Sequence, residues 1–118
     1  MDIQKIVNVF NIREVEKQVF EKLIYKSDSS ATEIARETGL SRTSIYDILE
    51  SLIKTGLVKE SASGSKKVFS VQNIKSIQKI LNDKKKDLKD AETLIEKISE
   101  TQKKMEEKAP LLQLYKGR

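Results

Sequence analysis

Four hydrogen-bonding side chains lie within five consecutive residues of this chain. They are a guanidinium, two hydroxyls and a phenol, from Arg42, Thr43, Ser44 and Tyr46. An arginine can donate two parallel hydrogen bonds to guanine, and hydroxyls donate to phosphate oxygens. Tyr46 could also donate to phosphate, or it could only cover the edge of a core. These residue types predict contact with DNA, and Arg42 is the best candidate for a bidentate base contact.

Two other parts of the chain carry side chains that could extend this contact. Lys66 and Lys67 close the small-residue segment 61–67, which predicts a wing that reaches a neighbouring groove or backbone; an ordinary exposed hairpin is the alternative. Ser30 and Thr32 begin another predicted helix, whose free N–H groups could bind phosphate. Simple capping of that helix explains these two residues equally well.

The distribution of charge limits how far DNA binding can rest on net charge. The chain carries +5, but residues 1–72 hold 11 Lys/Arg and 10 Asp/Glu, while residues 73–118 hold 12 and 8. Binding must therefore depend on the local placement of cations. Asp47 and Glu50 would repel phosphates, so we expect them to point away from the backbone, or Asp47 to pair with a nearby cation.

Catalysis is disfavoured by the absence of cysteine and histidine. The usual nucleophile–base pairs and zinc sites need one or the other, and no pair of carboxylates lies in an evident pocket. We therefore expect no enzyme, no metal and no cofactor. The sequence also has no signal peptide and no apolar stretch long enough to span a membrane, which favours a cytoplasmic protein.

Local signals predict the elements that would position these side chains. Ser30 and Glu33 form an S-x-x-E capping box, which predicts a helix over 31–38. Gly39 ends this helix, because glycine adopts positive φ without a Cβ penalty. The residues expected inward are Ala31, Ile34 and Ala35.

A second helix and a hairpin follow almost without spare residues. Ser41 caps a helix over 42–55, and Gly56 closes it. Leu57 and Val58 begin a strand, a turn follows at 61–65, and Val68, Phe69 and Val71 form the partner strand. The helix residues expected inward are Ile45, Ile48, Leu49, Leu52 and Ile53.

Upstream, Asn11 and Glu14 offer another capping signature for a helix over 12–26, after a short helix within 3–10. Its apolar face would hold Val15, Val19, Phe20, Leu23 and Ile24. The predicted fold class is mainly α with a small β-hairpin: a winged helix-turn-helix domain at 1–72, followed by a long coiled-coil helix at 73–109 and a tail at 110–118. Asn73 caps that long helix.

Apolar residues recur along the long helix at alternating steps of three and four, which is coiled-coil spacing. The positions at this spacing, here called the seam, include two polar residues, Lys84 and Gln102. The seam consists of Ile74, Ile77, Leu81, Lys84, Leu88, Ala91, Ile95, Ile98, Gln102, Met105, Ala109 and Leu112. A stripe of this length predicts a homodimer through residues 74–109. The alternative is that the helix folds back along its own domain, for which Ile80 and Leu94, off the seam, could serve.

The two polar seam positions favour an antiparallel pair. In a parallel dimer Lys84 would face its own copy, a pair of like charges. An antiparallel dimer with its dyad near residue 93 places Lys84 opposite Gln102, so both polar layers coincide. The dimer contacts then involve Ile77, Leu81, Leu88, Ala91, Ile95, Ile98 and Met105.

The segment ATEIARETGLSRTSIYDILESLIKTGLVKE resembles the winged helix-turn-helix of TrmB-like transcriptional regulators, found mainly in archaea. The resemblance covers about residues 10–118 and implies a dimer that binds operator DNA through a recognition helix at 42–54 and a wing at 61–67. Larger members continue into a sugar-binding domain, and the final residues PLLQLYKGR are similar to the entry to that domain. The chain is then either a fragment of such a protein or a short member of the family. We expect no small-molecule ligand in this chain.

Two departures from the family matter. The recognition helix is less basic than that of a strong DNA binder, and the wing carries glycine and serine where a cation is expected. Affinity should then depend on dimerisation and on the shape of the DNA site. The function predicted is sequence-specific binding of double-stranded DNA by a transcriptional regulator; the alternative is a winged-helix protein-interaction module without DNA binding.

Overall fold

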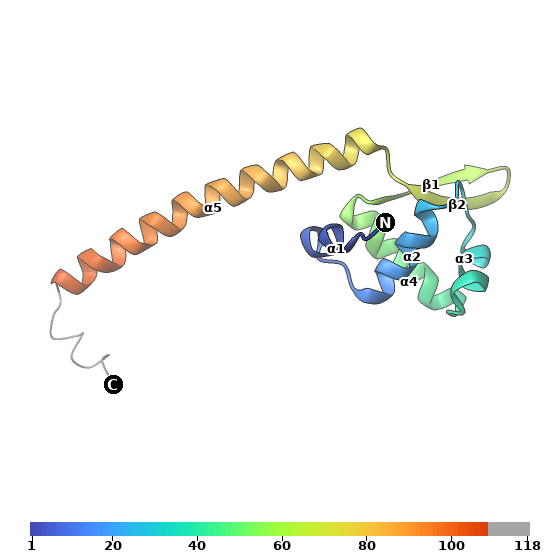
Figure 1. The fold of residues 1–118 in the computed structure, drawn as a ribbon, viewed down its shortest axis with the longest axis horizontal. Helices are drawn as coiled ribbons and strands as arrows, with labels where there is room; N and C mark the ends of the chain where they lie inside the picture. The colour runs from blue at the N-terminus through green and yellow to red at the C-terminus, as the bar shows by residue number, and fades with distance from the viewer. Residues whose placement is uncertain (109–118) are drawn as a thin grey trace. The chain divides into compact units, whose positions relative to one another are not determined.

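The computed structural model describes residues 1–108. Along the chain these residues form α1 (Gln4–Phe10), α2 (Glu14–Ile24), α3 (Ala31–Thr38), α4 (Arg42–Thr55), β1 (Val58–Ser63), β2 (Lys66–Val71) and α5 (Ile74–Lys108) (Figure 1). The predicted fold class is confirmed: mainly helical, with an antiparallel hairpin and a long C-terminal helix. The chain divides into two units, residues 1–78 and a second that begins at Lys79. The predicted tail at 110–118, which contains Leu112, and the last residue of the predicted long helix, Ala109, lie outside the described residues.

The two helices of the helix-turn-helix begin and end where the local signals predict. The Ser30 N–H donates to Glu33 Oε1 at 3.2 Å, and the Glu33 N–H donates to Ser30 Oγ at 3.2 Å, which completes the capping box of α3. Gly39, at φ 75°, ends α3. Ser41 Oγ accepts from the Ser44 N–H at 3.1 Å and starts α4.

Burial of one face of α4 builds the core. Ile45, Ile48, Leu49 and Leu52 are all buried, and α4 contacts α2, α3 and β1. The expectation for Ile53 was too strong, because this residue, at the edge of the buried face, is partly exposed. The same holds for Val15, Ile24 and Ala35. The remaining apolar core residues are Ile3, Val7, Phe10, Ile12, Val19, Phe20, Leu23, Ala31, Ile34, Leu57, Val58, Val68 and Phe69.

The start of α2 corrects one prediction. Asn11 does not cap this helix; it ends α1 in the left-handed region, at φ 54°. Asparagine tolerates that region better than most residues. The cap of α2 is Arg13, whose N–H donates to Glu16 Oε1 at 2.7 Å. The helix therefore begins at Glu14, two residues later than predicted, and ends at Ile24.

The hairpin is longer than its sequence indicates. The predicted turn at 61–65 is wrong, because β1 continues to Ser63 and β2 resumes at Lys66. The register pairs Val58 with Val71 and Ser63 with Lys66, so the turn is the two residues between them. Turns of two residues match the twist of paired strands.

Ser29 joins the hairpin to the helices. Its N–H donates to the Phe69 carbonyl at 3.0 Å, and the Phe69 N–H donates to the Ser29 carbonyl at 2.8 Å. This isolated bridge holds β2 beside the segment that precedes α3. The hairpin and the helix-turn-helix are thereby parts of one packed unit.

The long helix α5 starts where predicted. The Asn73 carbonyl accepts from the Ile77 N–H at 3.1 Å. The Asn73 side chain accepts from Lys59 Nζ at 3.3 Å. No residue of α5 is buried, and its large exposed apolar side chains are Ile74, Leu88, Leu94, Ile95, Ile98 and Met105. Within residues 1–108, no helix has the length and apolar character that crossing a membrane requires.

A buried carboxylate links the start of α2 to α4. Glu16 is 3% exposed and forms an ion pair with Arg13 at 3.1 Å. Burial raises the pKa of the Glu16 carboxyl, but hydrogen bonds from Ser51 and from Arg13, together with the Arg13 charge, outweigh burial and bring this pKa below its ordinary value. The ionised form is therefore the one that stabilises the folded state.

We expect Glu16→Gln to lower the free energy of unfolding by about 1 kcal/mol at neutral pH, since a charged hydrogen-bond acceptor is lost. Because the folded pKa is depressed, the Glu16 contribution is complete above the unfolded pKa of about 4.3 and is lost as pH falls through the folded pKa. Urea denaturation at several pH values measures this, with exposed Glu14→Gln as control. An equal difference between variant and wild type at neutral pH and near pH 3 would contradict the assignment.

Candidate nucleic-acid interface

The exposed face of α4 is polar and lies opposite the buried one. Thr43, Asp47 and Glu50 follow each other at steps of four and three, so they lie above one another on one side of the helix. All three are exposed. Arg42 and Tyr46 flank this line on one side. The structure therefore brings three of the predicted DNA-contacting residues, Arg42, Thr43 and Tyr46, onto one solvent-facing surface.

Arg42 and Tyr46 contact each other across one helical turn. Arg42 Nη2 donates to Tyr46 Oη at 3.3 Å, and the guanidinium carbon lies 5.8 Å from the centre of the tyrosine ring. A cation over an aromatic face is stabilised by the ring quadrupole. Tyr46 is 43% exposed. The contact restricts the guanidinium while leaving other N–H groups of Arg42 able to donate.

The hydroxyls at the start of α4 belong to its cap. Ser41 Oγ donates to Ser44 Oγ at 3.0 Å while accepting from the Ser44 N–H. The Ser44 hydroxyl can still donate, because its oxygen is the acceptor in that bond. Thr43 is exposed one residue earlier. The sequence predicts Ser41 only as a helix cap. Its side chain is exposed beside Arg42, Thr43 and Ser44, so its hydroxyl is a further candidate for contact with DNA.

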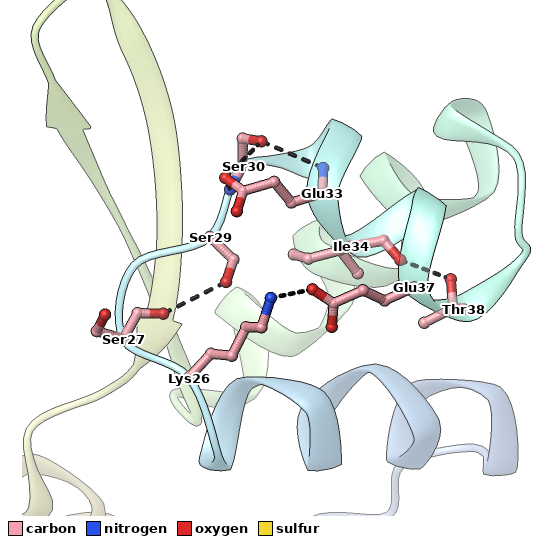
Figure 2. A network of polar contacts seen from close by, with 8 residues as sticks. All are labelled: Lys26, Ser27, Ser29, Ser30, Glu33, Ile34, Glu37 and Thr38. Atoms are coloured by element: carbon pink, nitrogen blue, oxygen red, sulfur yellow. Dashed lines mark hydrogen bonds and ion pairs between the residues drawn. The ribbon is translucent and has the colours of Figure 1, made fainter.

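The start of α3 already has an anionic occupant. Glu33 Oε1 accepts from both the Ser30 N–H and the Ser30 hydroxyl (Figure 2). The hydrogen bond from the Ser30 N–H, followed in strength by the one from the Ser30 hydroxyl, lowers the pKa of the Glu33 carboxyl. The charges of Lys26 and Lys66 act in the same direction. A phosphate at this helix end would compete with the Glu33 carboxylate for the Ser30 N–H. Thr32 is exposed beside it.

An ion pair that sequence reasoning missed joins the segment after α2 to α3. Lys26 Nζ donates to Glu37 Oε1 (Figure 2), and this hydrogen bond raises the pKa of the Lys26 ammonium. The two residues are eleven positions apart, a separation with no fixed geometry outside a single element. No local signal could have identified the pair.

The two wing lysines have different surroundings. Lys67 Nζ lies 3.9 Å from Glu60 Oε2 across the hairpin. Lys66 is next to the turn, paired in register with Ser63, and its charge acts on Glu33. Both side chains are exposed. Part of the positive charge of the wing is therefore compensated within the domain.

A helix pair with a solvent-facing second helix, followed by a two-stranded wing, defines the winged helix-turn-helix class of proteins. Residues 7–75 match the model of the family described as "Sugar-specific transcriptional regulator TrmB". The match spans more than half of the chain, and the chain belongs to the TrmB family. As a member of a family of transcriptional regulators, it is not an enzyme, and its family implies DNA binding.

The chain is similar to known proteins in sequence and in fold. An uncharacterized protein of Methanocaldococcus jannaschii is 41% identical over 68 residues, which are 58% of this chain and only 13% of that protein. A crystal structure from Sulfolobus tokodaii has a TM-score of 0.61 at 25% identity, covering 78% of this chain and 92% of that chain. A possible transcriptional regulator from Methanosarcina mazei has a TM-score of 0.65 at 10% identity, covering 85% and 88%, a likeness of fold alone.

We expect Ser30→Ala to lower the free energy of unfolding by about 1 kcal/mol, because the Glu33 N–H loses its acceptor. Urea denaturation should show a lower midpoint with an unchanged slope. Ser27→Ala, at an exposed serine three residues earlier, is the matched control and should leave the midpoint unchanged. Equal midpoints for the two variants would show that the capping box does not stabilise the domain.

Proposed function

We propose that this chain is a transcriptional regulator that binds double-stranded DNA sequence-specifically as a homodimer. The observation that carries the proposal is the exposed polar face of α4, with the Arg42 guanidinium held over Tyr46 at its N-terminal end. This is the end of a recognition helix that meets base edges. Family membership supports the DNA-binding part of the proposal.

In this proposal α4 lies in the major groove. Arg42 donates to a guanine, and Thr43 and Ser44 donate to phosphates or contact a thymine methyl group. Tyr46 orients Arg42 or donates to phosphate. Further backbone contacts come from Lys66 and Lys67 in the wing and from Ser30 and Thr32 at the start of α3. The proposed boundary between the winged helix-turn-helix domain and the long helix lies between residues 72 and 73.

The near balance of charge in residues 1–72 makes dimerisation part of the proposal. A module with 11 basic and 10 acidic residues gains little from non-specific attraction to phosphates. Two linked modules bind with an affinity that neither has alone. The sequence relative from Methanocaldococcus jannaschii is archaeal, and an archaeal chromosome lies in the cytoplasm, so the proposal places the protein there.

Arg42→Ala should weaken binding to a selected duplex by roughly tenfold, the value of one good base contact. Sites can be selected from a random duplex pool, and affinity measured by fluorescence anisotropy over a range of salt. Wild-type affinity should fall linearly in log–log form as salt rises, because counterions are released. Absence of binding at low salt would favour the alternative, a protein-interaction module.

The dimer would form through α5. Its seam residues Leu88, Ile95, Ile98 and Met105 are exposed in the single chain, and a helix of 35 residues needs a buried stripe to be stable in water. We propose a second copy as the partner, arranged antiparallel with its dyad near residue 93. The seam would also contain Ile77, Leu81 and Ala91. In this register Lys84 faces Gln102 rather than its own copy.

Engineered cysteines test the orientation cleanly, because the chain has none of its own. The double variant Leu81→Cys/Met105→Cys should form a disulfide-linked dimer under mild oxidation, since the antiparallel register places these positions opposite each other. Each single variant should remain uncrosslinked on a non-reducing gel. Efficient crosslinking of Leu81→Cys alone would indicate a parallel dimer and overturn the antiparallel proposal.

A further inference from the structure

We infer that Asp47 determines sequence specificity, as a carboxylate that accepts a hydrogen bond from the N4 amino group of a cytosine in the major groove. The inference rests on the proposed function, because it assigns a base to a residue of the same helix. The sequence predicts that Asp47 points away from the phosphate backbone or pairs with a nearby cation. The structure does not support the second expectation, because no ion pair of Asp47 is found among residues 1–108.

Asp47 lies in the middle of the exposed face of α4. It follows Thr43 by four residues and precedes Glu50 by three, so the three side chains lie on one side of the helix. This side is opposite the buried face formed by Ile45, Ile48, Leu49 and Leu52. If Arg42 and Thr43 lie in the major groove, Asp47 lies in it as well, because one helical turn separates Asp47 from Thr43 on the same side of α4.

The two acidic residues of this face differ in their surroundings. Glu50 Oε1 lies 3.6 Å from Lys54 Nζ, one turn further along α4. Its charge is therefore partly compensated by the helix itself. Among residues 1–108, no cation lies within ion-pair distance of the Asp47 carboxylate. Asp47 is the acidic side chain of α4 that retains an uncompensated charge.

The chemistry of the major groove decides which base such a group can contact. A carboxylate only accepts hydrogen bonds. Guanine presents two acceptors there, and thymine presents an acceptor and a methyl group. Adenine presents an amino donor next to the N7 acceptor, which repels a carboxylate. Cytosine presents its N4 amino donor with no acceptor on its own major-groove edge, so it is the base that an uncompensated Asp47 fits.

The same carboxylate disfavours binding to DNA sites that lack cytosine at this position. In the groove it loses water and approaches phosphates of its own sign, a loss that only a donor on the base can offset. Asp47 should therefore weaken binding to random duplexes while it favours sites with cytosine at one position. Discrimination of this kind uses a repulsive element together with an attractive one.

The experiment uses the full chain and the duplex selected with wild-type protein, in four versions that differ only at a G·C pair whose preference Arg42→Ala leaves unchanged. Asp47→Ala should bind the four versions with nearly equal affinity, a loss of discrimination on the order of tenfold. It should also bind random duplex more tightly than wild type. Asp47→Asn should move the preference from cytosine towards adenine, because an asparagine amide pairs with adenine N6 and N7.

Glu50→Gln is the matched control, because it removes one negative charge from the same face of α4. It should alter overall affinity without changing the base preference. A cytosine preference that persists in Asp47→Ala, or a selected site whose only required G·C pair is the one that Arg42→Ala releases, would overturn the inference while leaving the proposed DNA binding intact. Absence of salt-dependent binding by wild-type protein would overturn both. Thermal unfolding of each variant checks that the domain is folded.

Discussion

The burial of one face of α4 is the constraint on which the rest of the structure depends. Ile45 and Leu52 are fully buried in this face, and Leu49 is 1% exposed. Apolar contacts of this kind are the main source of folding free energy in a small domain. Because a helix has a fixed periodicity, orienting the apolar face towards α2 and α3 orients Thr43, Asp47 and Glu50 towards solvent. The candidate interface is thus a direct consequence of how the core packs.

Ion pairs compensate part of the charge of the domain. Lys26 pairs with Glu37, and Lys67 lies within ion-pair distance of Glu60. These pairs reduce the charge that the domain can offer to a long, uniformly anionic partner. Recognition of DNA by such a surface depends on individual base contacts more than on general attraction. Asp47 and Arg42, with opposite charges on one helix face, suit that kind of selectivity.

The exposed stripe of α5 adds a second constraint, of a different kind. It does not follow from the packing of the winged domain, since no residue of α5 is buried in the single chain. Its spacing is that of a coiled-coil helix. Dimerisation would convert two weakly charged modules into one bivalent binder, which is why the two parts of the proposal depend on each other.

The sequence by itself determined α3, α4 and the start of α5. The bounds of α3 and α4 were predicted correctly, because Ser30, Glu33, Gly39, Ser41 and Gly56 act within one helical turn of the positions they fix. Local signals were misleading at Asn11 and in the wing. A residue that can cap one helix can also end another, and the strands extend as long as their pairing continues, whatever the composition of the turn.

The tertiary structure alone decided which groups meet across elements. The contact of Arg42 with Tyr46 follows helical spacing and could have been foreseen. The Lys26–Glu37 pair, the burial of Glu16 near Ser51 and the Ser29–Phe69 bridge could not, because each joins segments whose relative position is set by core packing. Local rules act through bonds and turns of one element, whereas these contacts exist only once the apolar faces have been buried together.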